Sequence, residues 1–274
     1  VGDNGTILTS DNGTEWTART SGTSEKLNRV AYGDGRYIAV GENATYKYSD
    51  NASSWSQSKT SGNVHFNDIE YFGNSIWGGA GDYAHKTRQN VVGDQFSSDP
   101  ITEDQSSYFF KNYNGLTIGD DIILVGEEGF IAWSPDYMSF WTKDGGTSKN
   151  LRGTVHGNSI YVIVGDNGTI LTSDNGSTWT SRADGRTDNL SEVTFGNNTF
   201  IAVGDNGTIR TSSDNGTTWD NRTSGTTKFY GVTFGKNTFI AVGDNGTIRT
   251  SSDNGTTWDN RTSGTTVNLR GVGF

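Results

Sequence analysis

Residues 198–227, NTFIAVGDNGTIRTSSDNGTTWDNRTSGTT, decide the fold, because they recur letter for letter as residues 237–266. The marker of each copy is a glycine followed by Asp or Glu, and it recurs roughly every 39 residues along the chain. The marker glycines are Gly2, Gly41, Gly81, Gly126, Gly165, Gly204 and Gly243. A period near 40 with four strand-sized pieces per copy is typical of the blades of a β-propeller.

The pieces of one copy follow from the chemistry of the last repeat. Residues 228–234 and 238–242 alternate as strands. Asp244-Asn245-Gly246 is predicted to join the second strand to the third as a type I′ hairpin turn, because Asn and Gly tolerate positive φ. Residues 247–252 then form the third strand. A second Asp-Asn-Gly turn leads into the outermost strand at residues 256–261.

These pieces predict an all-β, seven-bladed β-propeller with four-stranded antiparallel blades, one of them shared between the two termini. We expect a single domain over residues 1–274, with the last blade closed by residues 267–274 together with residues 1–20. Most of the second strand of that blade is absent from the sequence. We expect flanking sequence to supply it, or the slot to stay open or to be filled by another chain. Because the chain starts in mid-motif, we interpret the sequence as an excerpt or a processed form.

Composition limits the partners and the compartment. The formal charge of −10 and the pI near 4.7 disfavour nucleic acid, which needs a concentrated basic face. Cysteine is absent, so there is no disulfide framework and no thiolate metal site. The longest apolar run, residues 122–125, is too short for direct membrane insertion. A cysteine-free chain rich in Thr, Asn and Gly favours an extracytoplasmic location, secreted, periplasmic or at the cell surface.

The second turn of four copies follows the pattern [ST]-x-D-x-G-x-x-W. The carboxylate is expected to accept hydrogen bonds from its own turn, the glycine to take a left-handed conformation, and the tryptophan to pack between neighbouring sheets. The residues are Asp11, Gly13 and Trp16, Asp174, Gly176 and Trp179, Asp214, Gly216 and Trp219, and Asp253, Gly255 and Trp258.

This pattern resembles the Asp box, or BNR repeat, of sialidases, sortilin-type receptors and photosystem II assembly factors. The resemblance implies a propeller fold and a structural role for the box on the outer hairpins, away from the binding face. In the photosystem II assembly factors, function depends on a basic, arginine-lined surface. This acidic chain departs from that pattern, so the function is not carried over.

A sialidase would also need an arginine cluster, a Tyr/Glu nucleophile pair and an acidic Asp, and the sequence has no early signature for them. His65, His85 and His156 lack the spacing of metal ligands. We therefore predict that the chain has no catalytic residues and is not an enzyme.

An acid follows every marker glycine, which predicts a ring of acids on one face. Either Asp simply suits this turn, or the ring attracts a basic partner or a cation. Ca²⁺ is the possible ligand, and no other cofactor is expected. The acids are Asp3, Glu42, Asp82, Glu127, Asp166, Asp205 and Asp244.

Residues 83–116 break the repeat and lengthen it. The aromatic residues Tyr108, Phe109 and Tyr113 in this segment suggest a ligand-binding loop, and drift within a tolerant blade is the alternative.

The predicted function is a non-catalytic recognition or scaffold module, with a protein or glycan as partner. We expect it to be part of a larger cell-surface or secreted protein or assembly, with flanking domains in the same chain. A glycan-binding, lectin-like propeller is the first alternative. A glycoside hydrolase of the Asp-box type, with two facing carboxylates, is the second.

Overall fold

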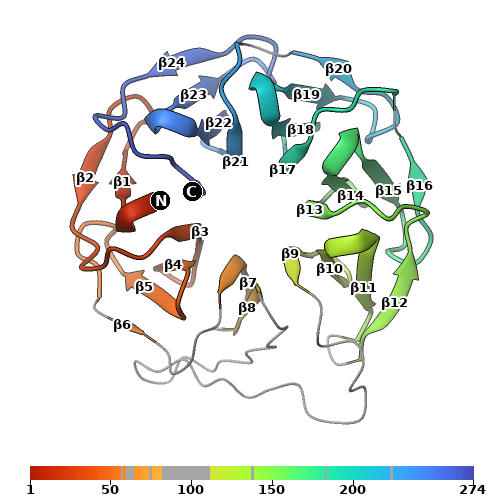
Figure 1. Ribbon diagram of the computed structural model, residues 1–274, viewed down its shortest axis with the longest axis horizontal. Coiled ribbons are helices and arrows are strands. Elements are labelled where there is room, and N and C mark those ends of the chain that lie inside the picture. Colours follow the sequence, from red (N-terminus) through yellow and green to blue (C-terminus); the bar gives the residue numbers. More distant parts are fainter. Residues whose placement is uncertain are drawn as a thin grey trace.

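The computed structural model describes residues 1–56, 58–59, 65–73, 76–81, 112–136, 139–182, 184–222 and 225–274. Antiparallel sheets stand radially around a central axis, so that the molecule forms a ring (Figure 1). Within each sheet the strands follow the chain order from the axis outward. The all-β propeller predicted from the repeat is therefore confirmed.

The strands fall into four concentric sets. The inner strands are β3 (Leu27–Gly33), β7 (Phe66–Gly73), β9 (Tyr113–Ile118), β13 (Leu151–Gly157), β17 (Leu190–Gly196) and β21 (Phe229–Gly235). The second strands are β4 (Arg36–Gly41), β8 (Ile76–Gly81), β10 (Ile122–Gly126), β14 (Ile160–Gly165), β18 (Thr199–Gly204) and β22 (Thr238–Gly243). The third strands are β1 (Ile7–Thr9), β5 (Thr45–Ser49), β11 (Phe130–Ser134), β15 (Ile170–Ser173), β19 (Ile209–Ser212) and β23 (Ile248–Ser251). The outer strands are β2 (Thr17–Arg19), β6 (Ser58–Lys59), β12 (Trp141–Asp144), β16 (Thr180–Ser181), β20 (Asp220–Asn221) and β24 (Asp259–Arg261).

The prediction of seven four-stranded blades, with one shared between the termini, is wrong. The described residues form five four-stranded blades, and their inner strands are β3, β9, β13, β17 and β21. The other two sheets, β1–β2 and β7–β8, have two strands each. In the first, the described chain places no strand between β1 and the C-terminal segment. In the second, Gly81 is followed by residues 82–111, which lie outside the described residues.

Five three-residue 3-10 turns lead into third strands, four of them directly from a second strand. They are η1 (Asp3–Gly5), η2 (Glu127–Gly129), η3 (Asp166–Gly168), η4 (Asp205–Gly207) and η5 (Asp244–Gly246). In η5, Asn245 and Gly246 have φ of 54° and 68°, and the Thr247 N–H donates to the Asp244 carbonyl at 3.0 Å. Positive φ at both central residues defines a type I′ turn, so this local prediction is confirmed.

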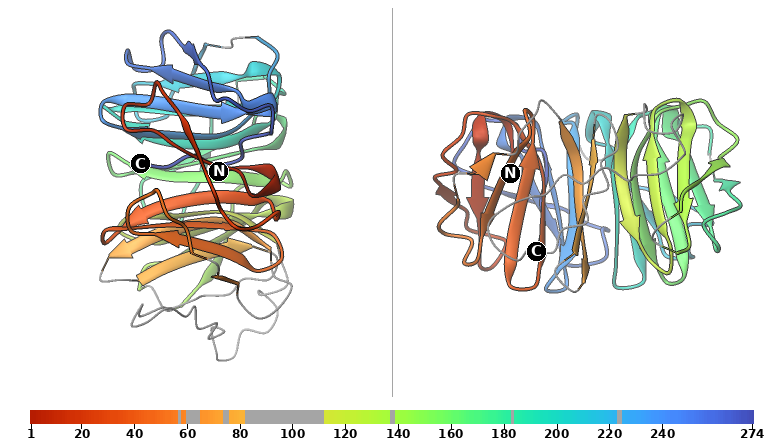
Figure 2. Two further views of the ribbon diagram at one scale, coloured as in Figure 1. Left: turned by 90° about the vertical axis from the view of Figure 1, so that its left-hand side faces the viewer. Right: turned by 90° about the horizontal axis from the view of Figure 1, so that it is seen from below.

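The two ends of the chain meet in the β1–β2 region. Gly2 forms an isolated antiparallel bridge with Leu269, and the N–H of Arg270 donates to the Val1 carbonyl at 2.8 Å. Both ends lie near the axis, the C-terminus toward the face opposite the turns (Figure 2).

The hydrophobic core lies between neighbouring sheets. One cluster joins Val162 and Ile170 of one blade to Phe200 and Trp219 of the next, all of them buried. Because the sheets pack face to face against their neighbours, the second strands are largely apolar, as in Thr199–Gly204, where every residue is buried. Among the described residues, no helix is long and apolar enough to span a membrane.

Candidate functional site

One face of the ring carries η1 to η5 and the connections that enter the inner strands; we call it the turn face. In Figure 1 the coils of these five turns all lie toward the viewer, and the right-hand view of Figure 2 shows coils along the upper edge of the ring. Among the described residues, the acids that follow the marker glycines therefore lie on the turn face.

These acids are bound by groups at or near the start of inner strands. Arg270 holds Asp3 with two hydrogen bonds, of 2.7 and 2.8 Å. Arg152 holds Asp166 in the same way, at 2.5 and 3.0 Å. The Arg270 hydrogen bond lowers the pKa of Asp3 below its usual value.

The remaining described acids have polar or basic partners as well. Lys228 pairs with Asp205 at 2.8 Å, and Lys26 pairs with Glu42. Asn112 donates to Glu127 at 3.1 Å, and Tyr230 hydrogen-bonds Asp244. Asp82 lies outside the described residues. The ring of acids is thus compensated by the protein's own side chains, and in the described part of the chain no group of three His, Asp or Glu residues could hold a metal ion.

The outer hairpins carry the Asp-box residues on the opposite face. Asp214 Oδ1 accepts the Thr218 N–H at 2.9 Å and the Ser212 hydroxyl at 2.8 Å, while Trp219 Nε1 donates to the Gly216 carbonyl at 3.0 Å. Asp253 accepts equivalent bonds from Thr257 and Ser251, and Trp258 Nε1 donates to the Gly255 carbonyl.

Two of the boxes differ from the sequence expectation in their acceptor. The Asn12 side-chain oxygen accepts the Thr14 and Glu15 N–H groups, and the Asn175 oxygen accepts those of Ser177 and Thr178. The amide one residue after Asp11 and Asp174 therefore closes these turns. The reason is length: Trp179 lies six positions after Ser173, whereas Trp219 lies seven positions after Ser212. Gly13, Gly176, Gly216 and Gly255 all have positive φ, as predicted.

Charged side chains meet inside the central channel. Arg29 of β3 pairs with Glu192 of β17, and its Nε lies 3.5 Å from Asp68 of β7. Strands β3 and β17 lie on opposite sides of the axis of the ring (Figure 1), and the Arg29–Glu192 pair joins them across it. Asp68 Oδ2 also accepts the Leu116 N–H of β9 at 2.9 Å. The cluster therefore connects four inner strands.

The channel has more acid than base. Burial raises the pKa of Glu192 to about 7 even though Arg29 opposes the shift, and burial raises the pKa of Glu70 well above its usual value. The Oε2 atom of Glu70 is buried, and no hydrogen-bond partner for it is found among the described residues. The sequence signal for this cluster was a set of charged inner-strand positions, Arg29, Asp68 and Glu192, where other copies have glycines such as Gly153 and Gly231. The sequence predictions rested on the turns and boxes of the repeat, so they did not include this cluster.

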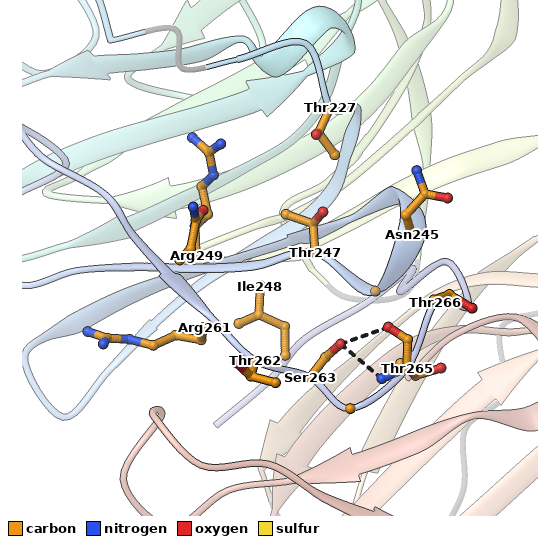
Figure 3. A pocket seen from close by; sticks show the side chains of 13 residues that line it. Thr227, Asn245, Thr247, Ile248, Arg249, Arg261, Thr262, Ser263, Thr265 and Thr266 are labelled. Atoms are coloured by element: carbon orange, nitrogen blue, oxygen red, sulfur yellow. Dashed lines mark hydrogen bonds between the residues drawn. The ribbon is translucent and has the colours of Figure 1, made fainter.

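A cavity of about 820 Å³ opens beside η5 on the turn-face side of the last four-stranded blade (Figure 3). It is lined by Thr227, by Asn245 to Arg249 and by Asn260 to Thr266; we call it the arginine cavity. Its lining residues include two arginines, six Thr or Ser residues and two asparagines, and no Asp or Glu. In Figure 3, Arg249 and Arg261 extend from neighbouring strands of the same blade.

The preceding copy has the same thirty residues but a different environment. Arg210 stands where Arg249 stands, yet it is fully buried and its Nη1 lies 3.1 Å from Asp184 in the connection before it. The connection before Arg249 has Ser224 at the place of Asp184 in the sequence. The non-repeated connections therefore distinguish two sites whose repeat residues are identical.

Of the aromatic residues predicted as ligand contacts, Tyr108 and Phe109 lie outside the described residues. Tyr113 begins β9, is only 2% exposed and packs against Phe130. It is a core residue, so it cannot be a surface contact.

Comparisons with known proteins find structural similarity only. No protein-family model matches the sequence, and no curated protein matches it. A structure of YCF48 bound to D1 peptide matches with a TM-score of 0.73 and 19% identity, covering 90% of this chain and 87% of that one. YCF48 from Cyanidioschyzon merolae matches with a TM-score of 0.68 and 14% identity, covering 96% and 90%. A nidogen/laminin complex matches with a TM-score of 0.59 and 12% identity, covering 99% and 95%.

These matches agree with the radial sheets and identify the chain as a β-propeller. At such low identities they define the fold and not the function. The fold resembles that of the two YCF48 structures along nearly the whole length of both chains.

Proposed function

We propose that this chain is a non-catalytic propeller that binds a carboxylate-bearing peptide segment of a protein partner in the arginine cavity. The observation that carries the proposal is the lining of the cavity, which has two arginines and no Asp or Glu in a chain whose formal charge is −10. Arg261 also pairs with Asp259, outside the lining, at 3.1 Å, so an acidic ligand would share or replace that contact. Such a site attracts acidic groups locally, while the rest of the surface repels them.

The polar groups of the cavity suit an extended peptide. Arg guanidinium groups bind carboxylates with two parallel hydrogen bonds, and the surrounding Thr, Ser and Asn side chains can donate to or accept from a peptide backbone. A volume of about 820 Å³ holds a few residues of such a segment. The structure of a similar propeller, YCF48, with a bound D1 peptide supports a peptide as the kind of ligand.

The compensated acids of the turn face favour the cavity over the acid ring as the binding site. Asp3 and Asp166 each receive two hydrogen bonds from an arginine, so a basic partner would have to displace those arginines. The extracytoplasmic location, the flanking domains and the Ca²⁺ ligand remain predictions from the sequence.

A titration with three labelled peptides tests the proposal. The first is an eight-residue peptide of alternating Gly and Asp, and the other two have Asn or Lys in place of Asp. We expect the Asp peptide to bind, the Asn peptide to bind at least about tenfold more weakly and the Lys peptide not to bind. The affinity for the Asp peptide should fall as salt rises from 50 to 500 mM, because screening weakens the charge contacts. Equal binding of the Asp and Asn peptides would contradict the proposal.

A further inference from the structure

The blade before the arginine cavity contains a carboxylate that two arginines of the chain itself bind. Asp184 lies in the connection between β16 and β17, and its Oδ1 accepts a hydrogen bond from Arg210 Nη1 at 3.1 Å. The same oxygen accepts the backbone N–H of Arg186 at 3.1 Å, and Oδ2 accepts Arg186 Nε at 3.0 Å. We call these three residues the Asp184 site.

The Asp184 site favours a charged carboxylate. Burial raises the pKa of Asp184, but the hydrogen bonds from Arg186 and the positive charge of Arg210 outweigh burial, and the pKa lies below its usual value. Asp188 is the other acid whose charge acts on Arg210, and the side-chain amide of Asn206 donates to it at 3.0 Å. Among the described residues, Asp184 is therefore the acid that directly contacts Arg210.

Arg210 has more donors than Asp184 uses. Its side chain is fully buried, and no hydrogen-bond partner for its Nε and Nη2 is found among the described residues. Buried donors without a partner are uncommon in folded proteins. A guanidinium group usually binds a carboxylate with two parallel hydrogen bonds, but Oδ2 of Asp184 is already held by Arg186. A carboxylate that is not tethered to this connection can therefore bind Arg210 with one more hydrogen bond than Asp184 does.

The last four-stranded blade has the same arginine without this acid. Arg249 corresponds to Arg210 in the identical repeat, and Ser224 takes the place of Asp184 in the sequence. Arg249 lines the arginine cavity, whereas Arg210 is fully buried. The two blades thus have the same repeat residues, and in one of them Asp184 fills the position that we assign to the partner's carboxylate in the other.

We propose that the Asp184 site is a second carboxylate-binding site, which Asp184 occupies as an internal ligand until the carboxylate of an acidic peptide segment replaces it. The replacing carboxylate binds Arg210 through two N–H groups and also contacts the Arg186 side chain. The inference rests on the carboxylate ligand proposed for the arginine cavity. It adds a site of lower affinity, because the tethered Asp184 competes at a high effective concentration.

The exposure of these side chains permits the exchange. The side chains of Asp184 and Arg186 are 30% and 47% exposed, so a ligand can reach both of them from solvent. Removal of the Asp184 carboxylate therefore leaves the Arg210 guanidinium facing a position that solvent can enter.

Calorimetric titration with the peptide of alternating Gly and Asp, in 50 mM salt, counts the sites. The wild-type chain should bind one equivalent tightly, in the arginine cavity. Asp184→Ser introduces the residue that stands at this position in the next copy, and the variant should bind two equivalents. Asp188→Ser removes the same charge from the same connection and should still bind one.

Chemical rescue tests the Asp184 site without the peptide. Asp184→Ala should melt at a lower temperature than the wild type, because two arginines lose their acceptor. Formate at 200 mM, with the ionic strength kept constant by chloride, should raise the melting temperature of this variant by at least about 2 °C more than that of the wild type. The reason is that an anion that binds the folded state stabilises it. Formamide, the uncharged analogue, should have no such effect.

Arg210→Leu is the control for the position of the bound formate. Leu171 stands at the equivalent place one blade earlier, so the repeat accommodates leucine there. In an Asp184→Ala background, Arg210→Leu should abolish the formate effect. Rescue that persists without Arg210, or that formamide equals, would contradict the assignment.

The results separate this inference from the proposed function. If the wild type does not bind the peptide but formate rescues Asp184→Ala through Arg210, the proposal for the arginine cavity fails and the Asp184 site stands. One equivalent bound by both the wild type and Asp184→Ser would overturn the inference. A formate effect of equal size in the wild type and Asp184→Ala would overturn it as well.

Discussion

At the scale of single residues, the boxes show that a motif position and a hydrogen-bond acceptor need not coincide. In the last box, Asp253 accepts hydrogen bonds from Thr257 and Ser251. In the box that is one residue shorter, the acceptor is Asn175, and the motif residue Asp174 comes just before it. Each acceptor closes a turn whose backbone N–H groups would otherwise depend on water.

Alanine substitutions separate these roles. Asp253→Ala and Asn175→Ala should each lower the free energy of unfolding by about 1 kcal/mol, because each removes an acceptor of turn hydrogen bonds. Asp174→Ala should change it by less than about 0.5 kcal/mol. Urea unfolding at pH 7 measures all three, and an equal loss for Asp174→Ala and Asn175→Ala would contradict the assignment.

The lowered pKa of Asp253 predicts that its contribution to stability depends on pH. Hydrogen bonds from Thr257 lower this pKa to about 2, below its value in the unfolded chain. The carboxylate therefore contributes stability that is present above the unfolded pKa and is lost as pH falls toward 2. The destabilisation by Asp253→Ala should shrink between pH 5 and pH 2 in thermal unfolding. A constant difference over that range would show that the carboxylate charge is not involved.

Glu70 in the channel has the opposite pH dependence. Burial raises its pKa well above the unfolded value, with Asp68 and Glu192 adding repulsion, while the Ile118 N–H lowers it. Between the two pKa values the folded protein binds more protons than the unfolded chain, so its stability falls as pH rises. Glu70→Gln should therefore raise the melting temperature at pH 8 and have little effect at pH 4.5. Glu127→Gln on the turn face is the control, and a gain independent of pH would contradict the prediction.

At the scale of elements, the tryptophan of a full Asp box joins its outer hairpin to the neighbouring blade, as Trp219 shows. Trp219 lies against Val162 and Ile170 of the preceding blade, and its indole N–H is bound by Gly216. The outer hairpin is short, β20 having two residues, so this side chain fixes it to the neighbouring sheet.

Trp219→Ala should cost about 3–5 kcal/mol, because it leaves a cavity between two blades. Trp141, which is 43% exposed, provides the comparison, and its replacement by Ala should cost about 1 kcal/mol or less. Denaturant unfolding of both variants checks the difference. Similar costs for the two would show that the box tryptophan is not a blade contact.

Local features were predictable from the sequence, and non-local ones were not. The Asp244-Asn245-Gly246 turn follows from positive φ at neighbouring residues, and the inner-to-outer strand order follows from the repeat. The number of four-stranded blades could not be predicted from the repeat. In the described residues β1 pairs only with β2, and β8 pairs only with β7. The use of Asn175 as the acceptor corresponds to a spacing from Ser173 to Trp179 that is one residue shorter than that from Ser212 to Trp219. The box pattern fits both copies, so it does not reveal this difference.

At the scale of the whole molecule, the channel charges join strands that are far apart in the sequence. Arg29 contacts Asp68 and Glu192, and its Nη1 donates to the Arg270 carbonyl at 3.2 Å. It therefore connects β3 to β7, to β17 and to the C-terminal segment. The pairing could not be predicted from the chain order, because 163 residues separate Arg29 from Glu192. Only the closed ring brings them together.

Removing Arg29 should destabilise the whole ring. Arg29→Ala should cost roughly 3 kcal/mol at pH 7, because it leaves carboxylates of the channel without their cation. Glu192→Gln in the same background should cost less than it does alone, and a double-mutant cycle by urea unfolding measures this coupling. Additive effects would show that the pair contributes nothing.

The identical repeats offer a matched pair of arginines for the partner site. Arg261 lines the arginine cavity and Arg222 occupies the same position one blade earlier, outside the cavity lining. Each forms an ion pair with the Asp two residues before it: Arg261 with Asp259 and Arg222 with Asp220. Losing this ion pair should therefore affect both variants equally. Arg261 Nε also donates to Thr250 Oγ1 at 2.8 Å, so the melting temperature of each variant is measured beside its affinity.

The most direct measurement is the affinity of the alternating Gly-Asp peptide for Arg261→Gln and Arg222→Gln, by calorimetric titration in 50 mM salt. Binding in the arginine cavity predicts a loss of about tenfold for Arg261→Gln and no change for Arg222→Gln. An equal loss in both variants, or none in either, would contradict the assignment of the cavity as the partner site.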